Sequence, residues 1–363
     1  MNKKINIFTS GRFHVLDLAK ELKANDFDIK FYSYVPAKRL KSFGLNSEDY
    51  VSLFLPLLPF IALEKIFKNV EFFKKIKIFA LDYLSAALMR KADFTIAMSG
   101  LFIKTLQKAK KENSIIIVER GSKHIVEQKR ILENIPSLSG TDPVPPFDVK
   151  REVASYDLAD VISVASRHVE ESFSNFGNLS KKIFVNPYGV DLKDFYHEDA
   201  AKKYDVIIVG NWSYQKGVDL LWKACKDLNV SLLHVGAAGD CLFPEDVLFT
   251  HQDAVDQKEL VHFYNHAKIS CLASRQDGFG MVLSQAIACG LPLVCSMHTG
   301  GADLKILLQD SSNIYVMTTY DVENLKMNIK EALAAEKENY GDLEILSWTS
   351  YGKRYSEFLN TIL

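Results

Sequence analysis

Apolar and polar positions follow two alternating patterns along the first half of the chain. Short runs rich in Ile, Val and Phe, such as residues 4–9, 28–33 and 114–120, are separated by longer segments whose apolar residues recur at helical spacing, such as 15–25. Apolar runs that alternate with amphipathic helices are typical of a parallel sheet covered on both faces. The pattern therefore predicts an α/β fold with a doubly wound sheet.

This pattern is interrupted once. Within residues 182–196, KIFVNPYGVDLKDFY, Pro187 and Gly189 break both periods, and a polar stretch follows. The alternation then begins again, which indicates a second doubly wound unit. Its expected strands are 204–210, 230–236, 269–273 and 291–296.

The interruption divides the chain into two Rossmann-like domains. Residues 1–188 would form the first domain, together with a terminal helix at 347–363, and residues 189–346 would form the second. Because parallel sheets bind ligands at the carboxyl ends of their strands, two such domains should face each other across a central cleft that holds the ligand. The terminal helix would begin at a Ser347 N-cap and carry an aromatic face that must pack on another part of the chain. That face consists of Trp348, Tyr351, Tyr355, Phe358 and Leu359.

Composition and charge narrow the range of partners. The chain has 363 residues, of which 48% are apolar and 25% are charged, as expected for folded domains without long disordered regions. Lys and Arg number 44 against 45 Asp and Glu, so no overall positive field would hold nucleic acid. The 5 cysteines form no C-x-x-C pair, and the first residues lack the apolar run of a signal peptide. Both features favour the cytoplasm.

Residues 51–80 are rich in Leu, Phe and Ile. Pro56 and Pro59 interrupt the run, and Glu64 and Lys65 follow closely. A membrane-spanning helix needs about 20 apolar residues without charges, so this segment is not one. Two interpretations stay open. The segment forms ordinary helices that pack on the core, or its lysines and phenylalanines form a basic amphipathic surface on the anionic inner face of the cytoplasmic membrane.

The run from Ser274 to Ser296 carries the most specific candidate chemistry. Its D-G-F-G turn, which begins at Asp277, lies between an apolar strand and a helix of small and apolar residues. Backbone amides at such a helix start attract a phosphate. Gln285, about a turn and a half into the helix, could address a second part of the same ligand. The alternative is a tight turn in which Asp277 only caps the helix. The residues expected to line this phosphate site are Gly278, Phe279, Gly280, Met281, Val282 and Leu283.

A second glycine-containing turn, VGNWSYQKGVDLL, places Lys216 at the start of a helix. A cation there opposes the helix dipole unless an anion accompanies it, so we expect Lys216 to neutralise phosphate charge. The alternative is an ordinary surface lysine.

Two loops of the first domain also carry polar side chains after predicted strands. The first, with Gly11, Arg12 and His14, lacks G-x-G-x-x-G and so does not predict a dinucleotide cofactor. The second contains Arg120, Ser122, Lys123 and His124.

No metal site is predicted. His262 and His266 are four residues apart, but the segment HFYNH lacks the Glu of H-E-x-x-H.

Several segments together resemble the retaining glycosyltransferases of family 4, the group 1 enzymes that use sugar nucleotides and have the GT-B fold. They occur in the expected order: GRFHVLDLAKEL, IIIVERGSKHIVEQKRIL, NPYGVD, VGNWSYQKGVDLL, DGFGMVLSQAIACGLP, HTGGADL and SWTSY. The resemblance implies that the second domain holds most of the nucleotide, that the terminal helix crosses back to the first domain, and that transfer retains the anomeric configuration.

The resemblance also implies roles for single residues. Asp277, His124 and Lys216 would form the catalytic centre, with His124 hydrogen-bonded to the donor sugar or the acceptor. His14, Arg120, Ser122 and Lys123 would face the sugar or the acceptor. Donor and nucleotide would contact Gly11, Arg12, Asn211, Lys216, Arg275, Gly278, Phe279, Gly280, Met281, Val282, Leu283 and Gln285.

Two departures from the family pattern affect this site. The family's pair of glutamates is replaced by Asp277, which has a shorter reach, and by Gln285, which would grip the ribose without a charge. That change should weaken the contact by about 1 kcal/mol. The family's diphosphate-binding arginine is replaced by Asn211, and we expect Arg275 or Arg12 to supply the missing cation.

The sequence thus predicts a retaining glycosyltransferase of surface polysaccharide synthesis, of the O-antigen or capsule type. It would move a sugar from a nucleoside diphosphate to a saccharide or lipid-linked acceptor without a metal or cofactor. The alternative is a weak or inactive relative that binds sugar nucleotides or serves as a scaffold. A third option is an epimerase or a phosphorylase on the same fold.

Overall fold

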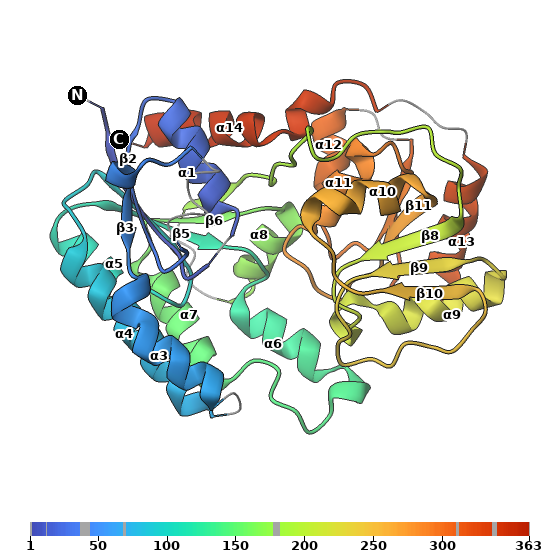
Figure 1. Cartoon of the computed structure of the whole chain (residues 1–363), viewed down its shortest axis with the longest axis horizontal. Coiled ribbons are helices and arrows are strands. Elements are labelled where there is room, and N and C mark those ends of the chain that lie inside the picture. Colours follow the sequence, from blue (N-terminus) through green and yellow to red (C-terminus); the bar gives the residue numbers. More distant parts are fainter. Residues whose placement is uncertain are drawn as a thin grey trace.

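A computed structural model of the chain describes residues 2–11, 13–36, 44–67, 70–176, 182–309, 312–335 and 340–362. Within these ranges, the strands form two separate parallel sheets (Figure 1). The predicted α/β fold with two doubly wound domains is confirmed.

The first sheet has the order β3-β2-β1-β4-β5-β6-β7. Its strands are β1 (Lys4–Phe8), β2 (Asp28–Ser33), β3 (Tyr50–Ser52), β4 (Phe94–Met98), β5 (Ile115–Arg120), β6 (Val161–Val164) and β7 (Lys182–Val185). Its helices are α1 (Val15–Ala24), α3 (Phe54–Ile66), α4 (Glu71–Leu88), α5 (Ile103–Lys111), α6 (Ile125–Glu133), α7 (Pro146–Leu158) and α8 (Arg167–Ser174).

The second sheet has the order β10-β9-β8-β11-β12-β13. Its strands are β8 (Tyr204–Val209), β9 (Leu232–Val235), β10 (Phe249–Gln252), β11 (Ala267–Leu272), β12 (Leu293–Cys295) and β13 (Ile314–Val316). The helices are α9 (Val218–Leu228), α10 (Leu260–Asn265), α11 (Met281–Ala288), α12 (Gly301–Leu308), α13 (Val322–Ala334) and α14 (Trp348–Thr361).

Both sheets are built from strands that are apolar on both faces, which is why they are covered on both sides. Ile5 and Ile7 of β1 and Phe94 of β4, for example, are completely buried. In each sheet the strand order reverses beside one strand, between β1 and β4 and between β8 and β11. Loops that follow these strands border the crevice where open α/β sheets bind ligands.

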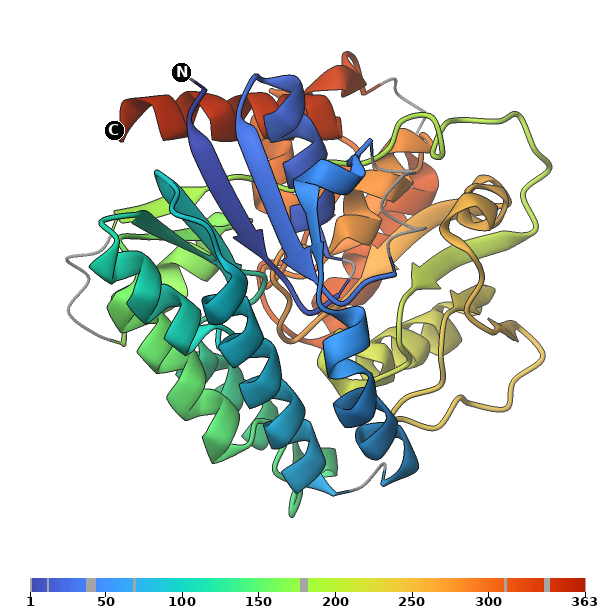
Figure 2. The ribbon, with the colours of Figure 1, turned by 60° about the vertical axis from the view of Figure 1, so that its left-hand side comes forward.

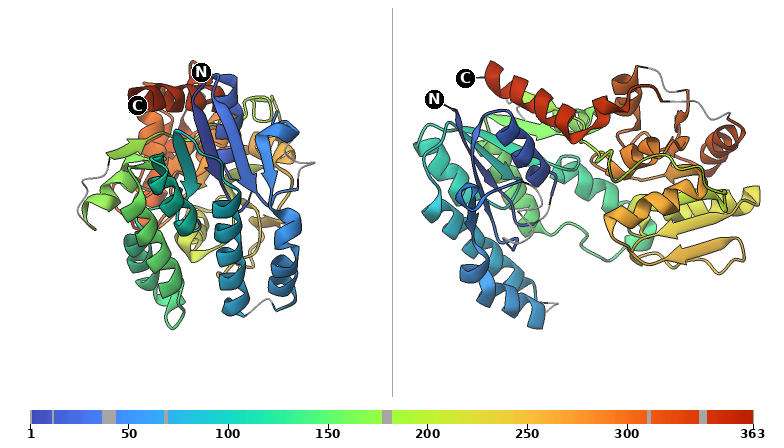
Figure 3. Two further views of the ribbon diagram at one scale, coloured as in Figure 1. Left: turned by 90° about the vertical axis from the view of Figure 1, so that its left-hand side faces the viewer. Right: turned by 45° about the horizontal axis from the view of Figure 1, so that its top comes forward.

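Helix α14 crosses from the second domain to the first, as expected, and lies along α1 (Figures 1 and 3). A β-carbon added to Gly352 would lie 2.2 Å from the β-carbon of Glu21, so this glycine permits the close approach of the two helices. The ring of Phe358 stacks on Phe184 with 3.9 Å between the ring centroids. The aromatic face predicted from the sequence therefore packs on the first domain.

All five cysteines are buried and unpaired. Burial raises the pKa of Cys271 well above its ordinary value, and it raises that of Cys295 to about 11. These two thiols pack in the core of the second domain, and nothing activates them as nucleophiles.

Helices α3 and α4 cover most of residues 51–80, and Pro59 lies inside α3 instead of ending it. Leu57 of α3 and Leu81 of α4 are buried in the core of the first domain, as ordinary packing predicts. Leu55, Ile66 and Phe72 are 74%, 71% and 62% exposed, so only part of the apolar surface packs on the core. Helices α3 and α4 pack against each other as a helical hairpin. Further exposed apolar side chains of this α3–α4 hairpin are Leu58, Leu63, Phe67, Val70, Phe79 and Tyr83.

The lysines of this hairpin are largely ion-paired. Lys74 contacts Asp148 and Lys75 contacts Glu71, both at 3.1 Å, and Lys77 is bonded to Glu64. Figure 2 shows the hairpin extending past the carboxyl ends of the first sheet's strands. No helix in the described ranges is long and apolar enough to cross a membrane.

Candidate functional site

The turn after β11 lies directly against the first domain. A β-carbon added to Gly278 would lie 1.8 Å from the carbonyl oxygen of Gly121, so only glycine fits at this contact. The hydroxyl of Ser166, after β6, donates to the carbonyl of Gly278 at 2.5 Å. His168 Nε2 lies 3.0 Å from the carbonyl oxygen of Asp277. The predicted D-G-F-G turn therefore faces the other domain.

The turn also holds two of the predicted catalytic residues together. Lys216 Nζ lies 2.5 Å from Asp277 Oδ2, and the amide of Gly278 donates to Asp277 Oδ1 at 2.9 Å. Asp277 does not cap α11, because the N-cap residue is Gly280, which adopts the left-handed conformation at φ 80°. The alternative role of Asp277 as a simple helix cap is therefore wrong.

The first turn of α11 has backbone donors to spare. The amide of Leu283 donates to the carbonyl of Gly280 at 2.9 Å. The amides of Met281 and Val282 have no acceptor within the described ranges. Such unsatisfied donors at a helix start attract an anion, and the turn that precedes them holds the ammonium of Lys216.

Gln285 lies on α11, and the residue is only 8% exposed. Its Oε1 accepts a hydrogen bond of 3.1 Å from the hydroxyl of buried Tyr264. One acceptor position of this oxygen is therefore used within the second domain. The second acceptor position and the amide nitrogen remain for a ribose.

The expectation that Arg275 supplies the missing diphosphate cation does not fit the structure. Its two terminal nitrogens bind the carboxylate of Asp219 at 2.6 and 2.8 Å, and one also donates to the carbonyl of Tyr214 at 2.7 Å. A guanidinium fixed in this way ties α9 to the turn and is not free for a phosphate. The other candidate, Arg12, lies outside the described residues. Asn211 is exposed after β8.

The loop after β1 reaches the junction through a stack of rings. His14 Nε2 bonds Glu119 at 2.9 Å, and its ring stacks on Tyr188 with 4.3 Å between centroids. Tyr188 in turn meets Phe279 of the D-G-F-G turn edge to face, at 5.9 Å. His14 is thus buried and supports the junction, while Gly11 turns the chain beside Thr9, whose hydroxyl donates to the Gly11 carbonyl at 3.1 Å.

His124 makes its contacts within the first domain. It caps α6, where its Nδ1 accepts from the amide of Val126 at 3.3 Å, and its ring stacks on Phe176 and meets Phe173 edge to face. Burial, and then the charge of Arg120, lowers the pKa of His124 to about 4. The ring belongs to an aromatic cluster inside the first domain, a position that favours a structural role over the predicted catalytic one.

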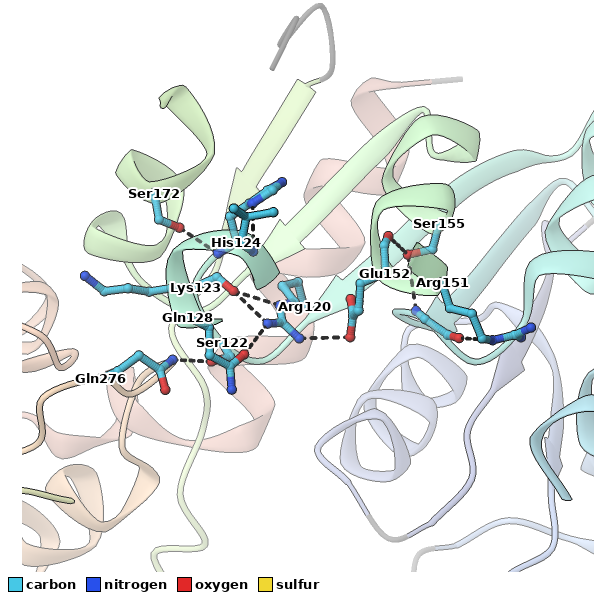
Figure 4. A network of polar contacts seen from close by, with 12 residues as sticks. Arg120, Ser122, Lys123, His124, Gln128, Arg151, Glu152, Ser155, Ser172 and Gln276 are labelled. Atoms are coloured by element: carbon cyan, nitrogen blue, oxygen red, sulfur yellow. Dashed lines mark hydrogen bonds and ion pairs between the residues drawn. The ribbon is translucent and has the colours of Figure 1, made fainter. Parts of the chain in front are cut away.

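Arg120 is also committed to its own domain (Figure 4). It donates twice to the carbonyl of Lys123, at 3.0 and 2.7 Å, and it also bonds Gln128 at 2.6 Å and Glu152 at 3.0 Å. These contacts shape the loop after β5. The expectation that Arg120 faces the sugar or the acceptor is therefore not met.

Ser122 and Lys123 do lie at the junction. The side-chain nitrogen of Gln276 donates to the hydroxyl of Ser122, and Gln215 Nε2 donates to Gln276 Oε1 at 3.0 Å (Figure 4). Gln276 is completely buried and joins the two domains.

Sequence reasoning missed Gln276, Ser166 and His168. Their only signal was their position, next to the D-G-F-G turn or shortly after β6.

Comparison with known proteins agrees with this arrangement. Residues 191–340 match the family described as glycosyl transferases group 1. The MMP alpha-(1->4)-mannosyltransferase of Mycolicibacterium hassiacum is 24% identical over 225 residues, which are 56% of this chain and 54% of that protein. The chain spans about half the length of the curated relatives it matches.

Two solved structures share the whole fold. Sucrose-phosphate synthase from Thermosynechococcus elongatus superposes with a TM-score of 0.69 at 15% identity, covering 99% of both chains. Anabaena Alr3699/HepE in complex with UDP and glucose gives a TM-score of 0.64 at 14% identity, covering 99% of this chain and 100% of that one. The architecture is therefore GT-B.

Proposed function

Residues 191–340 carry the signature of the group 1 glycosyltransferases, and from this premise we propose that the chain transfers a sugar from a nucleoside diphosphate to an acceptor held between the domains. One observation carries the proposal. The start of α11 has free backbone donors, and the turn leading into it holds Lys216 and abuts the first domain. Bound UDP in a GT-B neighbour supports a nucleotide as the ligand.

The chemistry assigned to these groups is stabilisation of a leaving group. As the bond from the anomeric carbon to phosphate breaks, negative charge grows on the departing diphosphate. This charge would be stabilised by the amides of Met281 and Val282 and by the ammonium of Lys216. These groups would bind the diphosphate more tightly in the transition state than in the bound substrate. Lys216 is held by Asp277 before the donor arrives, so the incoming phosphate would share this ammonium with the carboxylate.

We propose retention of the anomeric configuration, with attack from the face that the leaving group vacates. The diphosphate charge would be met by Lys216 and amides, without a metal or another cofactor. The direct contact between the D-G-F-G turn and Gly121 would help to exclude water from the reacting bond. Incubating the protein with UDP-, GDP- and ADP-sugars and following the product anomer by NMR tests both points. Absence of turnover across the panel, or an inverted product, would contradict them.

We propose a saccharide or lipid-linked acceptor of surface polysaccharide synthesis, used at the inner face of the cytoplasmic membrane. The exposed apolar side chains of α3 and α4 support a peripheral contact with lipid, because the hairpin carries large residues such as Leu55, Ile66 and Phe72 into solvent. The hairpin projects at the end of the first sheet where its functional loops lie (Figure 2).

Vesicle flotation tests this contact. The wild-type chain should float with phosphatidylglycerol vesicles, and the triple variant Leu55→Ser, Ile66→Ser, Phe72→Ser should remain in the soluble fraction. Because these side chains are exposed, the variant should keep its melting temperature. Equal flotation of the two proteins would contradict the membrane contact.

Sugar-nucleotide binding without transfer is a second candidate function. The observation that favours it is the bond between Tyr264 and Gln285, which already uses one acceptor position of the uncharged side chain expected to grip the ribose. A protein of this kind would bind the nucleotide sugar but show no turnover with any acceptor fraction.

A further inference from the structure

Lys123 differs from the other charged side chains in the interior. It is 7% exposed, and no other lysine in the described ranges is buried. Buried Arg120 is paired with Glu152 at 3.0 Å, and buried Arg151 with Asp82 at 3.2 Å. In the part of the chain that the structure describes, the Nζ atom of Lys123 forms no hydrogen bond or ion pair.

An unpaired ammonium in this position is costly. Burying most of a lysine side chain without a partner for its charge is unfavourable, so the position favours an anion beside the ammonium. Burial accordingly lowers the pKa of Lys123. The backbone of the residue is fixed, because its carbonyl accepts both bonds from Arg120 at 3.0 and 2.7 Å. The loop therefore places a cation for which its own domain supplies no ion-pair partner among the described residues.

Two imidazoles lie near enough to Lys123 to be influenced by its charge. His298, in the loop after β12, is attached to the D-G-F-G turn, because its carbonyl accepts from the amide of Asp277 at 3.2 Å. His168, at the start of α8, has an Nδ1 that is buried without a partner. Burial lowers the pKa of each imidazole to about 4, and the charge of Lys123 contributes in both cases. Both rings are therefore neutral near pH 7.

The neighbouring carboxylates do not neutralise this cluster. Glu127 and Glu171 are near enough to influence Lys123 electrostatically, but neither forms an ion pair with it. Glu127 is held by Arg130 at 2.7 and 2.8 Å. Lys216, the cation of the second domain, belongs to Asp277. A cation without an ion-pair partner thus remains at the domain junction, on a different loop from the start of α11.

We infer that Lys123 and His298 form a second anion site, which binds a phosphate or carboxylate group carried by a substrate between the two domains. The ammonium of Lys123 extends from the first domain toward the second (Figure 4). His298 would donate one N–H to the anion from the opposite side. The inference rests on the proposed function, because it assigns a charged group to that enzyme's acceptor or donor sugar.

The missing partner can be identified by thermal-shift titration of the whole chain. Inorganic phosphate is added to protein saturated with whichever of UDP, GDP or ADP stabilises it. Wild-type protein should melt at a higher temperature with phosphate, since a ligand that binds only the folded state stabilises it. Lys123→Met should bind phosphate at least tenfold more weakly and keep its response to the nucleotide. Lys123→Arg should restore most of the phosphate response.

Two controls separate this role from a structural one. Lys150→Met removes the same charge from an exposed position of the first domain, and its phosphate response should equal that of wild type. Without ligand, Lys123→Met should melt no lower than wild type, because it removes an unpaired buried charge. A lower melting temperature with an unchanged phosphate response would show that Lys123 is structural and overturn the inference.

Two further comparisons locate the source of the anion. A Lys123-dependent preference for glucose 6-phosphate over glucose assigns it to the acceptor. A Lys123-dependent preference for UDP-glucuronate over UDP-glucose assigns it to the donor sugar. A nucleotide response in wild type with no phosphate or carboxylate effect would overturn the inference alone. A Lys123-dependent phosphate response without any nucleotide response would overturn the proposed function and leave the anion site standing.

Discussion

The turn after β11 and the loop after β5 touch at the domain junction, yet they use their polar groups in opposite ways. In the turn after β11, side chains bind one another, as Lys216 binds Asp277, and backbone amides at the start of α11 remain free. In the loop after β5, Arg120 binds the carbonyl of Lys123 and His124 stacks on Phe176, so both side chains are engaged within the first domain. A substrate between the domains can therefore bind to backbone donors of the second domain, whereas the first domain offers it only a few side chains.

This comparison explains why a polar residue after a strand is a weak indicator of function. Position alone does not tell whether a side chain turns toward the ligand or back into its own domain. A glycine-containing turn before a helix is a stronger indicator, because it determines where backbone groups point.

The largest expected effect comes from Lys216. Lys216→Ala removes the ammonium beside the proposed leaving group and should lower kcat by about 10²–10³-fold. Its pair with Asp277 is partly exposed, so the melting temperature should change little. Steady-state kinetics with the accepted sugar nucleotide measure the first effect and thermal denaturation the second.

The matched control is Arg275→Ala, which removes another cation from the turn after β11. Because Arg275 binds Asp219 rather than a phosphate, this variant should lose stability more than nucleotide affinity. A fall in nucleotide affinity as large as that of Lys216→Ala would contradict this assignment.

The second-largest effect is expected at the contact between Gly278 and Gly121. A β-carbon at Gly278 would collide with the carbonyl oxygen of Gly121, so Gly278→Ala should force the domains apart at the site. A displacement of about 1 Å costs on the order of 10²-fold in turnover. Ser122→Ala, which removes only the hydrogen bond from Gln276, should have a much smaller effect. Equal turnover in wild type and Gly278→Ala would mean that this junction does not matter for catalysis.

The third effect concerns Gln285. A carboxylate there can accept from Tyr264 with one oxygen and from a ribose hydroxyl with the other, so Gln285→Glu should tighten nucleotide binding by about tenfold, or ~1.4 kcal/mol. Tyr264→Phe frees the amide oxygen without adding charge and should give a smaller gain. Calorimetric titration distinguishes these outcomes. Weaker binding in both variants would show that Gln285 does not face the ribose.

The smallest effect on activity is expected at His124. His124→Phe keeps the ring inside the aromatic cluster and loses only the cap of α6, which should cost about 1 kcal/mol of folding stability. Turnover should be unchanged, as measured with the same assay at a temperature well below the melting transition. A loss of turnover with normal stability would return His124 to the catalytic centre.

Much of the architecture could be predicted from the sequence because it follows from periodic patterns. The apolar runs at 4–9 and 204–210 mark β1 and β8, and the aromatic spacing from Trp348 onward marks α14. The start of α11 could be placed because Gly280 is required by its backbone conformation.

The pairings across the molecule could not be predicted in the same way. The partner of Arg275 is 56 residues away in the sequence, and that of Gln276 is 154 residues away. Such partners depend on how the loops of two domains meet. Exposure of the α3–α4 hairpin also depends on packing, since its composition alone fits a buried helix as well as an exposed one.

Calorimetric titration of the wild-type chain and Lys216→Ala with UDP, GDP and ADP tests the central claim most directly. The account predicts that one of these nucleotides binds to a single site per chain and that Lys216→Ala weakens this binding at least tenfold. Failure of all three to bind, or equal affinity in the two proteins, would contradict a diphosphate site at the start of α11.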